Sequence, residues 1–145
     1  MTDTLNSQAA SPAPLWRRLA AMAYDTLIAL ALLMTATAIA LPLNQGEAFG
    51  SGNLGFQLYL IAVVAGFFLL FWRKGGQTLG MRAWKIKLVT ESETAPSFGQ
   101  LVLRAITAVP SIALLGLGVF WSAFDRDKLA VHDRLSNTRL ILVSK

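Results

Sequence analysis

Three long apolar stretches dominate the pattern of hydrophobic and polar positions along this chain. They cover residues 19–41, 54–72 and 105–124; the first contains a single charged residue, Asp25, and the other two contain none. A helix needs about 20 mainly apolar residues to cross the hydrocarbon core of a bilayer. The pattern therefore predicts an all-α membrane protein with two transmembrane helices, at 19–41 and 54–72, and a third hydrophobic segment.

The third hydrophobic segment has two interpretations. Ser97 and Gln100 have the spacing of a capping box, so we expect a helix to begin at residue 98. Continued to residue 124, it would be about 40 Å long, longer than the membrane requires, and Pro110 and residues 116–118 are break points. The segment is either one kinked span or a re-entrant hairpin of two half-helices. The basic residues that follow favour the hairpin, which keeps them in the cytoplasm.

The stretch between the second and third apolar segments, residues 77–96, is too polar to cross a membrane. Residues 84–88 alternate apolar and basic side chains and lead into good strand formers, so a β-strand over 84–90 is favoured. An amphipathic helix at the membrane surface is the alternative, because Met81, Trp84 and Leu88 share one helical face. Residues 138–143 are predicted to be a second strand, and together the two would form a short cytoplasmic β-pair.

Basic residues orient the first two helices. Arg17 and Arg18 precede the first helix, Arg73 and Lys74 follow the second, and the loop at 43–53 has no Lys or Arg. The positive-inside rule places such basic ends in the cytoplasm. We therefore predict a multi-pass protein of a bacterial-type cytoplasmic (inner) membrane with a cytoplasmic N-terminus. A cleaved signal peptide is the rival interpretation of the first segment, but that segment is too long and is interrupted by an acid.

Composition narrows the functional classes. The chain is 54% hydrophobic and only 14% charged, whereas soluble domains carry about a quarter charged residues. Residues 1–15 are polar and predicted to be a disordered tail ahead of a membrane domain at 16–145. The net charge of +5 follows from the positive-inside rule, so nucleic acid is not an expected partner. With no cysteine and one histidine, no metal site or cofactor is expected.

Asp25 is the strongest candidate for a site residue. A carboxylate inside an apolar helix costs about 2.5–3.5 kcal/mol on insertion scales, so it normally faces protein or water. Arg18 lies two turns earlier on the same helix face. Candidate partners from other segments are Arg82, Arg104, His132 and Arg134. The functional interpretation is a carboxylate that exchanges a proton or ion; the structural interpretation, which we favour, is a salt bridge that fixes helix packing.

Four segments resemble, in order, the signature segments of the RDD family of small membrane proteins. They are LWRRLAAMAYDTLI around Arg18 and Asp25, GQTLGMRAWKIKLV at 76–89, LVLRAIT around Arg104, and the block from His132 to Thr138. On this resemblance, which extends over residues 14–143, the name-giving residues are Arg18, Asp25 and Asp133. The resemblance implies no activity beyond transport of an ion or ligand of unspecified identity.

These observations predict a membrane protein that contributes to transport of an ion or small ligand. The expected polar cluster consists of Arg18, Asp25, Arg104, His132 and Asp133. The alternative is a non-catalytic adaptor or assembly subunit of a larger membrane complex. Three hydrophobic segments are few for a transporter, so we expect the lipid bilayer and a homo-oligomer or larger complex as partners. No enzyme is expected, because the lone histidine has no orienting partner and is expected to make a structural hydrogen bond.

Overall fold

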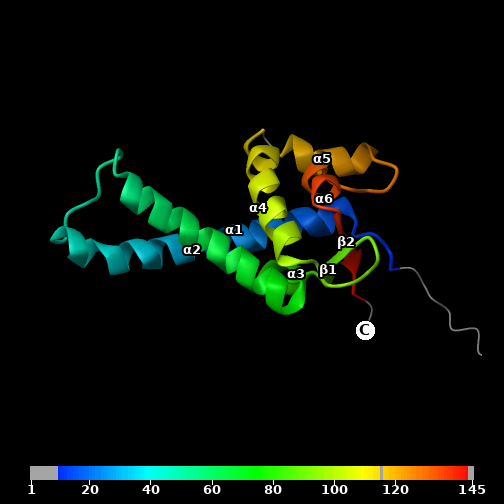
Figure 1. Cartoon of the computed structure of the whole chain (residues 1–145), viewed down its shortest axis with the longest axis horizontal. Coiled ribbons are helices and arrows are strands. Elements are labelled where there is room, and N and C mark those ends of the chain that lie inside the picture. The colour runs from blue at the N-terminus through cyan, green and yellow to red at the C-terminus, as the bar shows by residue number, and fades with distance from the viewer. Residues whose placement is uncertain (1–9, 115, 144–145) are drawn as a thin grey trace, which may run out of the picture.

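Two long helices form an extended hairpin, and the other elements gather at one end of it (Figure 1). The computed structural model describes residues 10–114 and 116–143. The hairpin consists of α1 (Leu15–Ala40), the short 3-10 helix η1 (Leu41–Asn44) and α2 (Leu54–Gly75). The gathered elements are α3 (Leu79–Ala83), β1 (Ile86–Thr90), α4 (Phe98–Ala113), α5 (Leu117–Phe124), α6 (Val131–Leu135) and β2 (Thr138–Leu142).

The hairpin helices agree with the two predicted transmembrane helices. Residues Leu15–Asn44 and Leu54–Gly75 are both long and apolar enough to cross a membrane. Helix α1 begins four residues earlier than its apolar stretch, so Arg17 and Arg18 lie within it. The Asn53 side chain caps the start of α2 by accepting from Phe56 N at 2.9 Å. The helix ends at Gly75 and is followed by Gly76, whose φ of 67° is the left-handed conformation that glycine tolerates.

The third hydrophobic segment is two helices. The predicted capping box is present, because Ser97 Oγ accepts from Gln100 N and Gln100 Oε1 accepts from Ser97 N. Helix α4 continues past Pro110 and ends at Ala113, and α5 begins after Gly116, which has a φ of 74°. The break therefore lies at the glycine and not at the proline, and the chain changes direction there (Figure 1).

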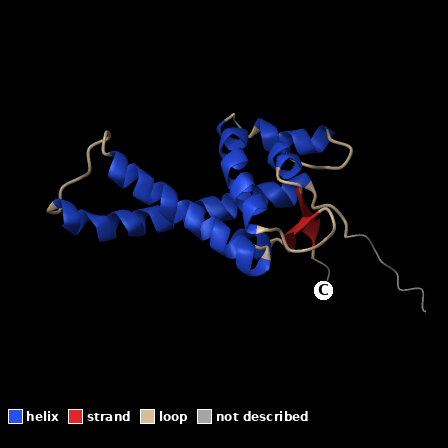
Figure 2. Ribbon diagram, in the orientation of Figure 1, coloured by secondary structure: helices blue, strands red, loops and turns tan. Residues whose placement is uncertain are grey.

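The two predicted strands pair with each other. Strands β1 and β2 are antiparallel, with Ile86 opposite Leu142, Leu88 opposite Leu140 and Thr90 opposite Thr138 (Figure 2). This confirms the strand interpretation over the surface helix. The first strand begins two residues later than predicted, because Trp84 still belongs to the end of α3.

The segment before α1 lies along the free edge of β2. Ala13 N donates to Leu140 O at 2.9 Å, and Leu142 N donates to Ser11 O at 2.9 Å. Ala13 is buried in the hydrophobic core together with Ile86, Leu88 and Leu101. The predicted disordered tail over residues 1–15 therefore does not hold for residues 11–14, which the sheet edge orders. Residues 1–9 of that prediction lie outside the described residues.

Candidate functional site

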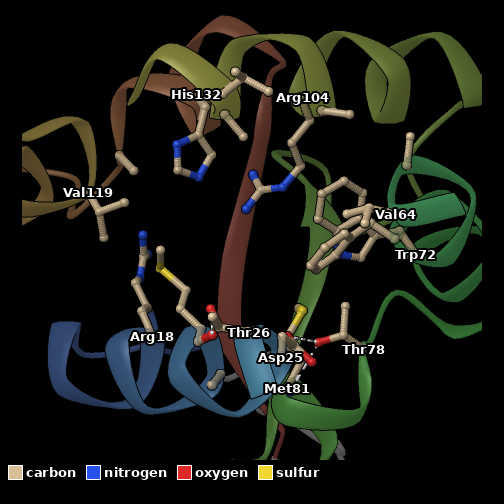
Figure 3. Close-up of a pocket in the computed structure, with 18 of the residues that line it drawn as sticks. Arg18, Asp25, Thr26, Val64, Trp72, Thr78, Met81, Arg104, Val119 and His132 are labelled. Carbon is tan, nitrogen blue, oxygen red and sulfur yellow. Dashed lines mark hydrogen bonds between the residues drawn. The ribbon is translucent and has the colours of Figure 1, made fainter. Parts of the chain in front are cut away.

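A cavity of about 570 Å³ lies where the hairpin helices α1 and α2 meet α4. Its wall is mostly apolar and is lined along the hairpin by residues such as Leu33, Leu60 and Val64. The polar side chains in its wall come from several elements, as Figure 3 shows. They are Arg18 and Asp25 with Thr26 from α1, Thr78 before α3, Arg104 from α4 and His132 from α6.

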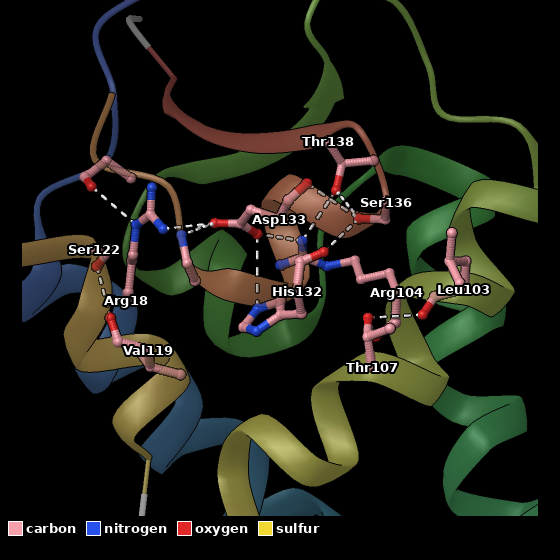
Figure 4. Close-up of polar contacts among 12 residues, drawn as sticks. Arg18, Leu103, Arg104, Thr107, Val119, Ser122, His132, Asp133, Ser136 and Thr138 are labelled. Atoms are coloured by element: carbon pink, nitrogen blue, oxygen red, sulfur yellow. Dashed lines mark hydrogen bonds and ion pairs between the residues drawn. The ribbon is translucent and has the colours of Figure 1, made fainter. Parts of the chain in front are cut away.

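Two arginines share one buried carboxylate beside this cavity. Arg18 Nη1 donates to Asp133 Oδ2 at 2.8 Å, and Arg104 Nη1 donates to Asp133 Oδ1 (Figure 4). The three side chains are only 3%, 5% and 0% exposed, in the order Arg18, Arg104, Asp133. We call these three residues the Arg/Asp cluster. Because they come from α1, α4 and α6, the cluster ties the third hydrophobic segment and the C-terminal region to the first hairpin helix.

Further hydrogen bonds fix each member of the Arg/Asp cluster. Arg18 Nε donates to Ala13 O at 3.0 Å, and Arg104 Nη1 donates to Thr138 Oγ1 at 3.0 Å. Asp133 Oδ2 also accepts from Ala130 N at 3.0 Å, so the carboxylate folds back onto the start of its own helix. Burial by itself would raise the pKa of Asp133, but the charges of the surrounding cations outweigh burial and hold that pKa below its ordinary value. The aspartate is therefore ionised at neutral pH.

The guanidinium group of Arg104 also faces an aromatic ring. Its Cζ lies 5.4 Å from the centroid of the Trp72 ring, a cation–π distance. Trp72 also lies in the cavity wall, so this contact joins the Arg/Asp cluster to α2.

His132 is buried beside the Arg/Asp cluster and is neutral at pH 7. Burial, followed by the charge of Arg104, lowers the pKa of its ring from 6.5 to about 4. Its Nε2 lies 3.7 Å from Asp133 Oδ1, which is too long for a hydrogen bond. Its Nδ1 has no hydrogen-bond partner within the described part of the chain. The predicted structural hydrogen bond is therefore not found at that nitrogen.

Asp25 lies in the same cavity wall but outside the Arg/Asp cluster. Thr78 Oγ1 donates to Asp25 Oδ2, and Gly80 N donates to Asp25 Oδ1 at 2.9 Å. Within residues 10–114 and 116–143 no salt bridge to Asp25 is found, and the candidate partner Arg134 pairs with Asp125 at 2.6 Å. The expected salt bridge is thus replaced by neutral donors, because α3 packs across α1 at this level and brings its first residues to the carboxylate.

That packing depends on a glycine. A Cβ atom built on Gly80 would lie 2.3 Å from the backbone oxygen of Ala21 and 2.9 Å from Asp25 Cγ. Thr78 contributes twice, because its Oγ1 also accepts from Met81 N at 3.2 Å and so caps α3. The sequence marks this stretch, within residues 77–96, as too polar to cross a membrane. A Thr followed three residues later by Met81 could have indicated a cap for a short helix. That local signal does not show that α3 packs against α1.

The structure therefore divides the five predicted site residues into two groups. Arg18, Arg104, His132 and Asp133 come together, whereas Asp25 is held separately by α3. Sequence reasoning did not identify Thr78 or Trp72 as wall residues, nor Thr138 as a partner of an arginine. Among the described residues, no three His, Cys, Asp or Glu side chains are placed to hold a metal ion.

Stability should fall on acidification because of His132. The folded ring binds a proton only near pH 4, whereas the unfolded ring does so near 6.5, so between these values the unfolded state binds more protons. Lowering the pH from 6.5 to 4 should therefore reduce the free energy of unfolding by about 3 kcal/mol. Chemical denaturation in micelles over this range measures the slope. In His132→Gln the free energy of unfolding should depend less steeply on pH over this range. An unchanged slope in that variant would contradict the lowered pKa of His132.

Comparisons with known proteins place these residues in a family context. The model of one family, described as the RDD family, matches residues 12–137, a range that includes Arg18, Asp25, Arg104 and Asp133. An uncharacterized protein of Rickettsia prowazekii (strain Madrid E) is 29% identical over 82 residues, which make up 56% of this chain and 45% of that protein. The matched region thus spans less than half of that relative's length. No solved structure matches the chain.

Proposed function

The chain belongs to the RDD family, and on that premise we propose that it is a multi-pass membrane protein that contributes to transport of an ion or small ligand. The cavity between α1, α2 and α4 is the proposed binding site. The Arg/Asp cluster recognises the charge of the ligand, and Asp25 exchanges a proton or ion. The proposal includes no catalytic role.

The observation that carries this proposal is the charge balance at the cavity wall. Two guanidinium groups share one carboxylate, and the neighbouring His132 is neutral at pH 7. Ionisable side chains within membrane segments are costly and usually mark ligand or ion paths. The proposed exchange of a proton or ion at Asp25 is supported because Asp25 lines the same cavity and its partners, Thr78 and Gly80, are uncharged.

The proposed location is a bacterial-type cytoplasmic membrane with the N-terminus in the cytoplasm. Arg17 Nη1 donates to Trp84 O at 3.2 Å, and Leu88 N donates to Gly76 O at 2.7 Å. The basic start of α1 and the basic end of α2 therefore meet the β-pair at one end of the hairpin. The positive-inside rule assigns that end to the cytoplasm. In this arrangement α4 and α5 form the re-entrant hairpin.

We also propose that the chain works as a homo-oligomer or within a larger complex. No residue of α2 is fully buried, and Leu54, Leu58 and Ile61 on one face of it are more than 60% exposed, so lipid or other helices would cover that face. The same exposed surface favours the second candidate function, a non-catalytic adaptor that docks on a larger membrane complex. Crosslinking in native membranes distinguishes them: an adaptor should yield a stoichiometric partner of different sequence.

The transport proposal predicts that Asp25→Asn abolishes flux without unfolding the protein. Asparagine has the same shape, and its amide can donate to Thr78 Oγ1 while its oxygen still accepts from Gly80 N. Flux in proteoliposomes should fall by at least about tenfold, equivalent to about 1.4 kcal/mol. Trapped pyranine reports internal pH after sodium, potassium or chloride gradients are imposed.

Asp127→Asn is the matched control, because this carboxylate is 73% exposed and lies outside the cavity. The control should retain the flux of the unmodified protein. Equal flux with Asp25→Asn, or no flux in the unmodified protein, would refute transport and leave the adaptor role.

A further inference from the structure

Several side chains that line the cavity hold a buried polar atom with no hydrogen-bond partner among residues 10–114 and 116–143. These atoms are Arg18 Nη2, Trp72 Nε1, Arg104 Nε and His132 Nδ1, and each belongs to a side chain that lines the cavity (Figure 3). The two arginine side chains are at least nine-tenths buried. Buried donors in native proteins are almost always satisfied, and leaving them unpaired is costly. The two arginines thus keep donor capacity that the described residues leave unused.

The charge of the Arg/Asp cluster favours an acidic group. Arg18 and Arg104 carry two positive charges against the one negative charge of Asp133. Asp25, the carboxylate that lines the cavity, lies outside this cluster and accepts hydrogen bonds from Thr78 and Gly80. Guanidinium groups bind carboxylate and phosphate oxygens through short charge-assisted hydrogen bonds. The headgroup that fits is therefore a carboxylate or a phosphate monoester.

The rest of the cavity selects an apolar tail. Leu33 and Leu60, from the two hairpin helices, line the wall, as do Val64 and Val109. Leu33 lies fifteen residues beyond Arg18 on α1, about 22 Å along the helix axis. A small inorganic anion would leave this long apolar wall without contacts. The volume of about 570 Å³ falls within the range of sites that hold one compact organic ligand, which favours one chain over two.

We propose that this cavity binds a single-chain amphiphile, with its acidic headgroup on Arg18 and Arg104 and its tail along the apolar wall between α1, α2 and α4. This inference rests on the proposed function, because it names the ligand class of the same site. The ligand would reach the cavity from the bilayer, where such molecules concentrate. Its headgroup then neutralises the surplus positive charge of the Arg/Asp cluster.

Quenching of tryptophan fluorescence tests the proposal with the full chain in phosphatidylcholine nanodiscs. The probe is a fatty acid with two bromines on its tail, which should quench Trp72 saturably because that ring lines the cavity. Trp72→Phe should remove the saturable part. The methyl ester of the same acid lacks the charge and should bind at least about tenfold more weakly, the expected loss for one charge-assisted interaction.

Competition distinguishes the sources of the headgroup chemistry. Hexadecyl phosphate should displace the brominated acid, whereas acetate and inorganic phosphate at the same concentration should not. If acetate or inorganic phosphate displaces the brominated acid, the site binds the charged group without requiring a tail, and the proposal is overturned. Displacement only by two-chain phosphatidic acid would overturn the single-chain assignment.

Two variants separate the headgroup from the tail. Arg104→Gln should weaken binding by about tenfold or more, but it also removes a partner of Asp133. Ala65→Phe avoids the Arg/Asp cluster and fills the tail region, since Ala65 lines the cavity from α2. Ala62→Phe is its control, because Ala62 is exposed on the same helix and does not line the cavity; its affinity should stay within about twofold.

Equal affinity in Ala65→Phe and Ala62→Phe, or no saturable quenching in the unmodified protein, would overturn the amphiphile site. The pyranine assay is independent of this result. Flux without amphiphile binding would refute only the ligand class, whereas binding without flux would refute only transport.

Discussion

Replacing Asp133 by asparagine is expected to lower the free energy of unfolding by about 3–5 kcal/mol, the usual cost of breaking a buried ion pair by removing one partner. The carboxylate is fully buried and is the shared acceptor of Arg18 and Arg104. Asparagine keeps the shape but carries no charge, so two buried guanidinium groups lose their counterion. Thermal and chemical unfolding in detergent micelles, followed by circular dichroism, measures the loss.

The matched control is Asp127→Asn, at an exposed carboxylate whose contact with Arg134 is 3.6 Å long. It should change stability by less than about 0.5 kcal/mol. The double variant Asp133→Asn with Arg18→Gln should lose less free energy of unfolding than the sum of the two single variants, because both single changes break the same interaction. Additive effects, or an Asp133→Asn protein as stable as the unmodified one, would contradict the cluster as described.

Replacing Gly80 by alanine should destabilise the protein by about 3 kcal/mol or more, at the upper end of overpacking effects. The new Cβ would lie 2.3 Å from the backbone oxygen of Ala21, which cannot rotate away as a flexible side chain could. Helices α1 and α3 would have to separate, and the hydrogen bond from Gly80 N to Asp25 would lengthen or break. The same unfolding measurements report this cost.

Gly66→Ala is the control for the glycine substitution. Gly66 lies within α2, and a Cβ there would have no neighbouring atom within 4 Å in the part of the chain that the structure describes. Because alanine is the better helix former by about 1 kcal/mol, this variant should be as stable as the unmodified protein or more stable. A Gly80→Ala protein that unfolds at the same temperature as the control would show that α3 does not pack closely on α1.

Features that depend on neighbouring residues were predictable from the sequence. The two helices long enough to cross a membrane follow from runs of about 20 mainly apolar residues, and the start of α4 follows from the spacing of Ser97 and Gln100. The strand over Ile86–Thr90 follows from alternation and β-branched residues. Each of these signals lies within one turn, one strand or one helix, where local physics dominates.

Features that depend on how distant segments pack were not predictable in the same way. The break at Gly116 was one of two candidates, and only the structure shows that α4 accommodates Pro110. The ordered segment at residues 11–14 has a composition typical of a flexible tail, and β2 orders it by offering a free edge. Neither outcome is encoded in a local pattern.

The sequence by itself determined that this protein has two apolar helices with charges in and beside them, and that Arg18, Asp25, Arg104, His132 and Asp133 are its unusual polar residues. Only the tertiary structure decided how they divide. Asp133 pairs with both arginines although it lies 115 residues from Arg18, while Asp25 receives Thr78 and Gly80. The reason is geometric: a buried carboxylate binds the donors that folding brings within about 3 Å, and that proximity is created by helix packing.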